Sequence, residues 1–224
     1  MKTTVIAVDG YASTGKSTLS KRLASELNFT YIDTGYMYRV VSYFALNNNL
    51  ITNDVILEDQ LEIALAKTNF TWSKNSESKQ MMFNGRVYGD EIRTLEISTW
   101  VSRIAQLGFV REHLVNQQRI LSQLGSVVMD GRDIGTVVFA NADYKFFLTA
   151  DPKVRAQRRY DELQGKGEDV RFDEILKNVV DRDHQDSTRA ISPLKKAADA
   201  IEIDTTLFSV EEVFQKMVST IKSS

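Results

Sequence analysis

The chain has 224 residues, enough for one α/β domain with small insertions and an ample hydrophobic core. It contains no cysteine, which excludes disulfides and thiolate metal sites, and its two histidines argue against a zinc enzyme. A net charge of −2 and a pI near 5.8 argue against a general nucleic-acid-binding or anionic-membrane surface.

The sequence shows no sign of export or membrane insertion. No apolar stretch approaches the ~20 residues that a membrane helix needs. The N-terminus runs straight into the first predicted strand, which leaves no room for a signal peptide. We therefore expect a soluble cytoplasmic protein that has neither a membrane nor a nucleic acid as a partner.

The first motif, Gly-x-x-x-x-Gly-Lys-Ser at residues 10–17, has the spacing of a phosphate-binding loop. An apolar run at residues 5–8 predicts a buried strand before it, and leucines every four residues from Leu19 predict a helix after it. Glycines let the backbone wrap around phosphate oxygens, and the helix N-terminus presents N–H groups to the anion. Lys16 is expected to reach the β and γ phosphates of ATP, and the Ser17 hydroxyl to ligate Mg²⁺. The predicted ATP-binding residues are Gly10, Tyr11, Ala12, Ser13, Thr14, Gly15, Lys16, Ser17 and Thr18.

Strands and helices alternate along the rest of the chain. Further strands are predicted at residues 29–32, 126–129, 144–148 and 200–203. Helices are predicted at residues 36–47, 53–67, 91–105, 109–124, from 151, and at 173–186, with a closing helix behind the capping box Ser209–Glu212. This alternation predicts a parallel sheet covered by helices on both faces, with ligands at the carboxyl ends of the strands.

Two stretches interrupt the alternation within what we expect to be a single domain, residues 1–224. Residues 68–90 contain two β-prone runs and the turn signal Asn84-Gly85, which predict a small antiparallel insertion on the substrate side of a core formed by 1–67 and 91–224. Residues 151–189 form two helices around Gly165-Lys166-Gly167, a flexible tip. Their positive and negative charges nearly balance, so they indicate either a charged helical surface or a lid, and not a nucleic-acid patch.

Polar clusters follow the predicted strands at residues 10–17, 33–39 and 130–133, so we expect them at one edge of the sheet. The second and third clusters read Asp-Thr-Gly-Tyr-Met-Tyr-Arg (33–39) and Asp-Gly-Arg-Asp-Ile-Gly-Thr-Val-Val (130–138), and Arg-Ala-Ile-Ser-Pro-Leu follows at 189–194. Together these motifs resemble the bacterial cytidylate kinases, a family of P-loop nucleoside monophosphate kinases, over nearly the whole chain. One departure is Tyr36, where the family has a small residue and where a ring is expected to narrow or reshape the acceptor site.

The resemblance implies transfer of the γ-phosphoryl group from MgATP to CMP or dCMP. It places Arg39, Arg132 and Arg189 on the acceptor phosphate, a task that suits the planar, permanently charged guanidinium. It places Ser102, Arg111 and Asp133 around the cytosine, where a carboxylate would accept a hydrogen bond from the exocyclic amine. From helical position alone, Ser102 and Arg111 would be expected on the solvated surface. The full set of acceptor residues that it implies is Thr34, Tyr38, Arg39, Ser102, Arg111, Asp130, Arg132, Asp133, Arg182, Asp186 and Arg189.

Catalysis is expected to come from positioning and charge neutralisation, since the acceptor phosphate is already anionic. The residues implied are Lys16, Arg132 and the arginines Arg155, Arg158 and Arg159, any of which could reach the transferring phosphate when a lid closes. A kinase of the same fold acting on another small acceptor, such as UMP, is the nearest alternative. A nucleotide-dependent switch is the alternative from another class. No heptad pattern is present, so we expect a monomer.

Overall fold

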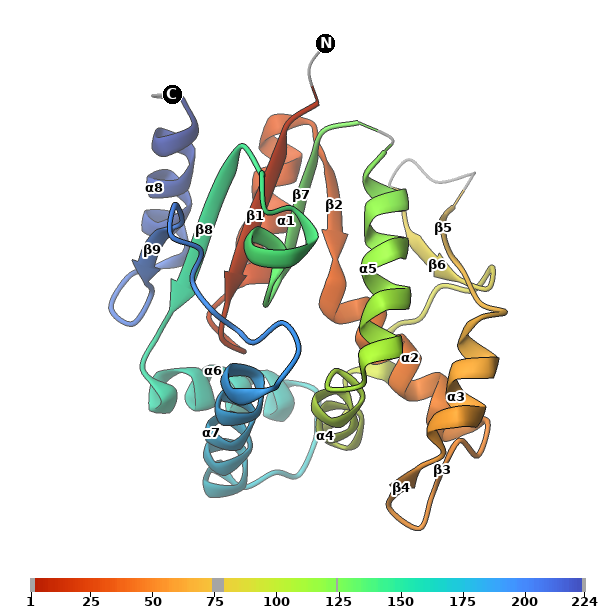
Figure 1. Cartoon of the computed structure of the whole chain (residues 1–224). Coiled ribbons are helices and arrows are strands. Elements are labelled where there is room, and N and C mark those ends of the chain that lie inside the picture. The colour runs from red at the N-terminus through yellow and green to blue at the C-terminus, as the bar shows by residue number, and fades with distance from the viewer. Residues whose placement is uncertain (1–2, 74–78, 124, 223–224) are drawn as a thin grey trace. The chain divides into compact units, whose positions relative to one another are not determined.

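The computed structural model describes residues 3–73, 79–123 and 125–222 (Figure 1). The chain divides into two compact units, one formed by Met1–Tyr31 with Gly125–Ser224 and the other by Ile32–Leu124. Within the described ranges, none of the helices has the length and apolarity needed to span a bilayer.

The first unit is built on a five-stranded sheet with the strand order β2-β7-β1-β8-β9. The strands are β1 (Val5–Gly10), β2 (Thr30–Asp33), β7 (Val127–Gly131), β8 (Tyr144–Thr149) and β9 (Ile201–Asp204). β1 pairs in parallel with β7 and β8, and β8 pairs in parallel with β9. Because the strands are parallel, the loops that follow them leave from one edge of the sheet, as the sequence predicts.

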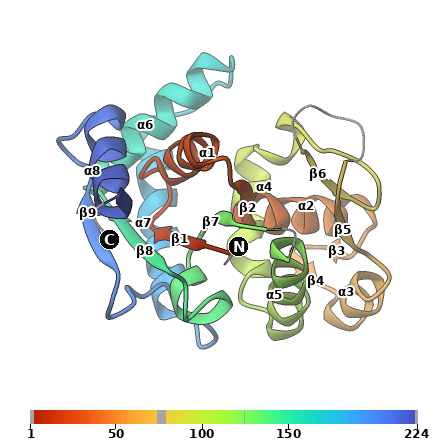
Figure 2. The same cartoon turned by 90° about the horizontal axis from the view of Figure 1, so that it is seen from above.

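Alternate side chains of the strands face two different environments. Ile6, Val8, Phe146 and Leu148 belong to a buried cluster with α1 (Lys16–Leu27) and α8 (Val210–Lys222). Figure 2 shows α1 and α8 on one face of the sheet and the short turn η2 (Ile134–Val138), drawn in green, on the other. Asp9 and Lys145, which alternate with the core residues, therefore face η2.

The remaining helices of this unit lie within residues 151–189, where the sequence predicts two helices. α6 (Pro152–Gly165) packs against α7 (Phe172–Thr188), and the Asp151 carboxylate caps α6 by accepting from Lys153 N at 2.8 Å. The capping box before α8 is confirmed, because Ser209 N donates to Glu212 Oε2 and Glu212 N donates to Ser209 Oγ.

The second unit consists of helices and two small antiparallel pairs of strands. Its elements are α2 (Thr34–Asn47), β3 (Ile51–Thr52), β4 (Val55–Ile56), α3 (Glu58–Leu65), β5 (Phe70–Trp72), β6 (Met81–Phe83), η1 (Asp90–Ile92), α4 (Leu95–Ile104) and α5 (Gly108–Ser122). The pair β5–β6 is the predicted antiparallel insertion, and Asn84-Gly85 makes the predicted turn under the bridge between Phe83 and Arg86. Residues 74–78 of the insertion and Leu124, assigned from the sequence to the fifth predicted helix, lie outside the described residues.

The helix predicted at residues 53–67 is wrong over its first turn. Asn53 and Asp54 have φ values of 49° and 61° and connect β3 to β4 in an antiparallel pair. Two consecutive residues with positive φ fit the tight turns that favour hairpins. The helix therefore begins only at Glu58.

Candidate active site

The phosphate-binding loop begins where β1 passes closest to β8. A Cβ at Gly10, whose φ is 144°, would lie 2.0 Å from the Leu148 carbonyl oxygen, so no side chain fits there. Gly15, with φ of 87°, precedes the first residue of α1, Lys16. The backbone path alone therefore favours glycine at both positions of the motif.

The carbonyl oxygens of this loop point into the protein, where they accept hydrogen bonds. Thr14 Oγ1 donates to Tyr11 O at 3.0 Å, and Lys16 Nζ donates to the same oxygen. Arg155 Nη1 lies 3.4 Å from Ala12 O, and Thr205 Oγ1 donates to Thr14 O at 3.2 Å. A loop whose carbonyls are turned inward can present its N–H groups to an anion.

Lys16 and Ser17 lie beside the acidic end of β7. Burial, followed by the charge of Arg132, lowers the pKa of Lys16 well below its usual value, while Asp130 opposes this shift. Ser17 Oγ donates to Asp130 Oδ2 at 2.8 Å, and the Tyr31 hydroxyl donates to Asp130 Oδ1 at 2.9 Å. Bound phosphate groups would favour the charged form of Lys16.

The donor set at this point fits Mg²⁺. The site offers a hydroxyl and a carboxylate in contact, and Mg²⁺ binds hard oxygen ligands while keeping several waters and substrate phosphates in its shell. No group of three or more histidine, aspartate or glutamate side chains within residues 3–73, 79–123 and 125–222 could hold a metal alone. Ser17 and Asp130 therefore suit an ion that arrives with a nucleotide.

Arginines gather around two carboxylates after β7. Arg132 Nε donates to Asp186 Oδ2 at 2.8 Å, and Arg189 lies 3.8 Å from Asp186 and 3.7 Å from Asp133. Burial and the charge of Arg132 lower the pKa of Arg182 to about 10. Burial works against the charged form of Arg132, but Asp186, Asp130 and Asp183 together outweigh it and raise the pKa of Arg132. Arginine side chains at this position can bind a phosphate dianion with two hydrogen bonds each.

The three arginines of α6 have different environments. Arg155 is 2% exposed, pairs with the Asp183 carboxylate and lies 5.1 Å from the centre of the Tyr11 ring. Arg158 donates to the side chain and carbonyl of Thr205 at 3.1 and 2.7 Å. Arg159 pairs with Glu162 on its own helix. Arg155 thus connects α6 and α7 to the phosphate-binding loop.

In the second unit, the predicted acceptor residues of α2, α4 and α5 are largely buried. Arg39 Nη1 donates to Ser98 Oγ at 3.2 Å, and the Arg111 guanidinium lies 5.7 Å from the centre of the Tyr38 ring. Arg111 and Ser102 are 3% and 7% exposed, so the solvated positions expected from helical position alone are wrong for both. Thr34, the first residue of α2, is buried as well.

Tyr36 turns its hydroxyl toward the insertion. The hydroxyl donates to Met81 O at 3.1 Å and accepts from Tyr88 N at 3.0 Å. Burial raises the pKa of Tyr36, which keeps the hydroxyl protonated and able to donate. The ring therefore holds β6 and the segment after it to the start of α2.

Sequence analysis assigned no role to several residues that contact the predicted site. They are Asp9, Tyr31, Ser98, Asp183 and Thr205. Asp9, Tyr31 and Thr205 lie within or directly after a strand, so extending the strand-end rule to every polar residue would have found them. Ser98 and Asp183 lie on helices, where a single sequence carries no such signal.

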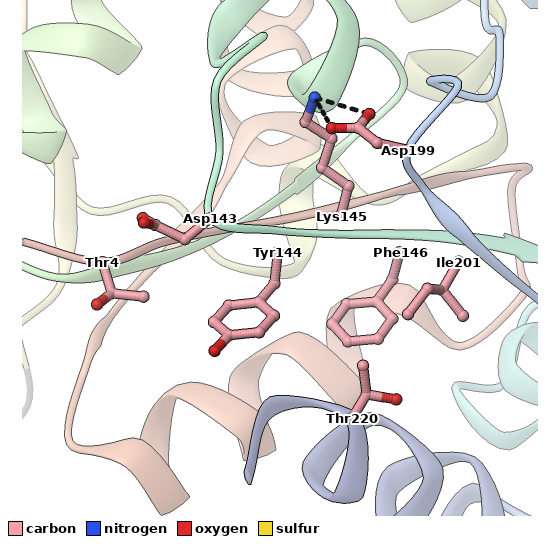
Figure 3. Close-up of a pocket in the computed structure, with 8 residues that line it drawn as sticks. All are labelled: Thr4, Asp143, Tyr144, Lys145, Phe146, Asp199, Ile201 and Thr220. Carbon is pink, nitrogen blue, oxygen red and sulfur yellow. Dashed lines mark hydrogen bonds and ion pairs between the residues drawn. The ribbon is translucent and has the colours of Figure 1, made fainter. Parts of the chain in front are cut away.

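A cavity of about 440 Å³ lies at the opposite edge of the sheet (Figure 3). Thr4, Tyr144 and Ile201 line it at the amino ends of β1, β8 and β9. Figure 3 shows Tyr144 on the α8 side of β8 and Lys145 on the other side, bound to Asp199 at 2.8 Å. Its place at the amino ends of the strands separates this cavity from the phosphate-binding loop.

Comparisons with known proteins agree on one family. Residues 6–223 match the family model described as Cytidylate kinase. The chain is 48% identical over 223 residues to a cytidylate kinase of Flavobacterium johnsoniae, covering 99% of this chain and 97% of that protein. It is 44% identical over 216 residues to a cytidylate kinase of Carboxydothermus hydrogenoformans, covering 96% of each. A crystal structure of an uncharacterized protein from Eubacterium ventriosum, 14% identical with a TM-score of 0.51 and complete coverage of both chains, shows likeness of fold alone.

Proposed function

Because the chain belongs to the cytidylate kinase family, we propose that it transfers the γ-phosphoryl group of ATP to CMP or dCMP, giving ADP and CDP or dCDP. It is an ATP-dependent nucleoside monophosphate kinase. The observation that carries the residue assignment is the arginine cluster around Asp133, directly after β7, and Asp186, on α7.

We propose that residues 10–18 bind ATP, with Lys16 on the β and γ phosphates. The inward-facing carbonyls of the loop and its place before α1 support this role. Ser17 and Asp130 would hold Mg²⁺ directly or through its waters. When bound with the nucleotide, the ion would neutralise charge on the phosphates.

The acceptor phosphate needs cations that stay charged next to a second polyanion. We propose Arg132 and Arg189 in the first unit and Arg39 in the second for this task, with Arg182 and Asp186 near the ribose. A bound anion would favour the charged form of Arg182, because burial and then the charge of Arg132 lower its pKa. No general base is required, since the attacking oxygen is already anionic.

We propose that Asp133, Ser102 and Arg111 select the base, and that Thr34 and Tyr38, whose ring lies 5.7 Å from the Arg111 guanidinium, also contact the acceptor. A carboxylate accepts from the exocyclic amine of cytosine, whereas uracil presents an oxygen there. An unmatched buried polar pair costs roughly 1–3 kcal/mol, which is enough for a clear preference. The burial of Asp133, Ser102 and Arg111 supports the assignment, because a surface group would discriminate weakly.

We propose that α6 and α7 act as a lid that excludes water during transfer. Arg158 and Arg159 make contacts to Thr205 and Glu162, which closure could exchange for contacts to phosphate. Arg155 reaches the loop already, through Ala12 O. Its role would be to hold the loop while the other two arginines approach the reacting group.

We further propose a cytoplasmic monomer. The absence of an extended heptad pattern in the sequence supports the assignment as a monomer. A solution mass of 25.4 kDa by light scattering would agree with the proposal, and twice that mass would contradict it.

The function is tested by ADP release from MgATP with CMP, dCMP, UMP, AMP or GMP as acceptor. We expect strong stimulation by CMP and dCMP and a weak response to UMP. Asp133→Asn should reduce the preference for CMP over UMP about tenfold or more, since an amide can pair with either base. Equal responses of the unmodified enzyme to UMP and CMP would indicate a broader pyrimidine kinase. No response to any acceptor would overturn the proposal.

A further inference from the structure

Asp9 is a buried carboxylate at the end of a central strand. It is the last residue of β1 before Gly10 opens the phosphate-binding loop, and it is 5% exposed. It faces η2, on the side of the sheet away from α1 and α8. Buried carboxylates are rare unless hydrogen bonds or a cation compensate them. The partners of Asp9 therefore indicate why it is there.

Both oxygens of Asp9 accept hydrogen bonds from the backbone of the next motif. Ile134 N donates to Oδ1 at 2.8 Å, and Gly135 N donates to Oδ2 at 2.7 Å. These N–H groups belong to the first two residues of η2, a turn that closes when Val137 N donates to Asp133 O. The carboxylate thus fixes the chain immediately after Arg132 and Asp133.

The glycine of this turn lies close to two side chains. A Cβ at Gly135 would lie 3.4 Å from Asp9 Oδ2 and 3.1 Å from Lys145 Cδ. Lys145 is itself held on the other side, where Nζ donates to Ala140 O at 2.6 Å and to Asp199 at 2.9 Å. The start of η2 is therefore fitted between Asp9 and Lys145.

We propose that Asp9 is a positioning residue for the acceptor nucleotide. It joins the strand that carries the ATP-binding loop to the loop that carries Arg132 and Asp133. It acts through those two side chains, so the inference rests on the acceptor roles proposed for them above. Two charge-assisted bonds from one rigid strand would keep both groups at a fixed distance from the phosphate-binding loop.

The test compares Asp9→Asn with Asp143→Asn. Asp143 Oδ2 accepts from Val5 N at 2.9 Å, so the control makes the same change from carboxylate to amide at the other end of the same strand, where one acceptor oxygen is enough for the single N–H donor. An asparagine at position 9 can accept with one oxygen only and turns an amide donor toward the second N–H group. We expect the KM for CMP to rise about tenfold to a hundredfold. The KM for ATP and the thermal midpoint should change no more than in the control.

Backbone exchange separates positioning from a purely structural role. Amide exchange at Ile134 and Gly135 should accelerate in Asp9→Asn and not in Asp143→Asn. Faster exchange with an unchanged KM for CMP would overturn the proposal, and so would unchanged exchange. A parallel rise in both KM values with a large drop in midpoint would also overturn it, since that pattern indicates general loosening.

A second variant covers the case in which Asp9→Asn does not fold. Gly135→Ala keeps Asp9 but presses a methyl group against Oδ2 and Lys145, so the KM for CMP should rise in the same direction. An unchanged KM for CMP in that variant would contradict the proposal. The acceptor roles of Arg132 and Asp133 have a test of their own. If Asp133→Asn and Arg132→Lys leave the acceptor kinetics unchanged, those roles are wrong regardless of the result for Asp9.

Discussion

At position 10 the main chain runs so close to β8 that the side chain of any other residue would meet the Leu148 carbonyl. Gly10→Ala places a methyl group 2.0 Å from that oxygen and also has to adopt a φ of 144°. The strained backbone alone costs about 1–3 kcal/mol, and the collision adds to it. We expect the free energy of unfolding to fall by at least about 3 kcal/mol in chemical denaturation.

Gly125→Ala is the matched control for this collision. Gly125 has a φ of 141°, but among the described residues, its chain neighbours apart, no atom lies within 4 Å of the position that its Cβ would take. The same backbone strain therefore acts without a clash. Equal losses of stability in the two variants would show that φ, and not contact with β8, decides the requirement for glycine at position 10.

At the scale of elements, the Tyr36 hydroxyl makes two hydrogen bonds between α2 and the insertion. Tyr36→Phe removes the acceptor of Tyr88 N and the donor to Met81 O. We expect the Tyr88 amide to exchange about tenfold faster or more, because losing such a bond costs about 1 kcal/mol or more. Hydrogen exchange followed at that amide measures the effect.

Tyr43→Phe provides the comparison for Tyr36. The Tyr43 ring packs against Tyr88 at 5.6 Å between ring centres, so this variant removes a hydroxyl from a neighbour of the same residue. It should leave exchange at the Tyr88 amide unchanged. If both variants accelerate that exchange alike, the hydroxyl of Tyr36 has no special part in fixing the insertion.

Elements whose signals are local could be predicted from the sequence. The strand before the phosphate-binding loop, the parallel alternation and the capping box at Ser209 all follow from short-range patterns, and the structure confirms them. The hairpin at residues 51–56 was missed because a helical pattern from Leu57 onward hid the turn at Asn53 and Asp54. Asn and Asp are favoured both as helix caps and in turns with positive φ, so residue type alone could not distinguish a helix start from a hairpin turn.

The candidate site residues show the same contrast between short-range patterns, which the sequence reveals, and long-range contacts, which it does not. Clusters directly after strands were found because parallel strands place their loops at one edge. The burial of Arg111 and the pairing of Arg155 with Asp183 depend on how helices distant in sequence pack, which one sequence does not encode locally. Asp9 was visible as the polar end of an apolar run, but its partners lie 125 and 126 residues further along the chain.

At the scale of the whole molecule, Asp9 makes the global stability depend on pH. Burial raises the pKa of this carboxyl from 3.8 to about 6, and Asp133 adds to the shift, while the N–H groups of Gly135 and Ile134 and the charge of Lys16 oppose it. The folded protein binds the proton more tightly than the unfolded chain. The stabilisation that comes from protonated Asp9 is therefore complete below about pH 4 and is lost as the pH rises through about 6.

Urea unfolding at pH 5 and pH 7.5 tests this dependence by comparing the free energy of unfolding of the unmodified protein with that of Asp9→Asn. The unmodified protein should lose about 1–2 kcal/mol more stability than the variant over that interval. Asp143→Asn should behave like the unmodified protein. If the variant and the unmodified protein change in parallel, the carboxyl of Asp9 does not titrate within this range.

The inward carbonyls of the phosphate-binding loop have a consequence for the speed of nucleotide capture. Tyr11 O, Ala12 O and Thr14 O are held by side chains of the protein itself, so the loop is shaped during folding. The loop is therefore already ordered when a nucleotide arrives, and binding carries no further entropy cost for ordering it. The observed association rate should rise in proportion to nucleotide concentration without reaching a plateau, as in a one-step encounter with a ready surface.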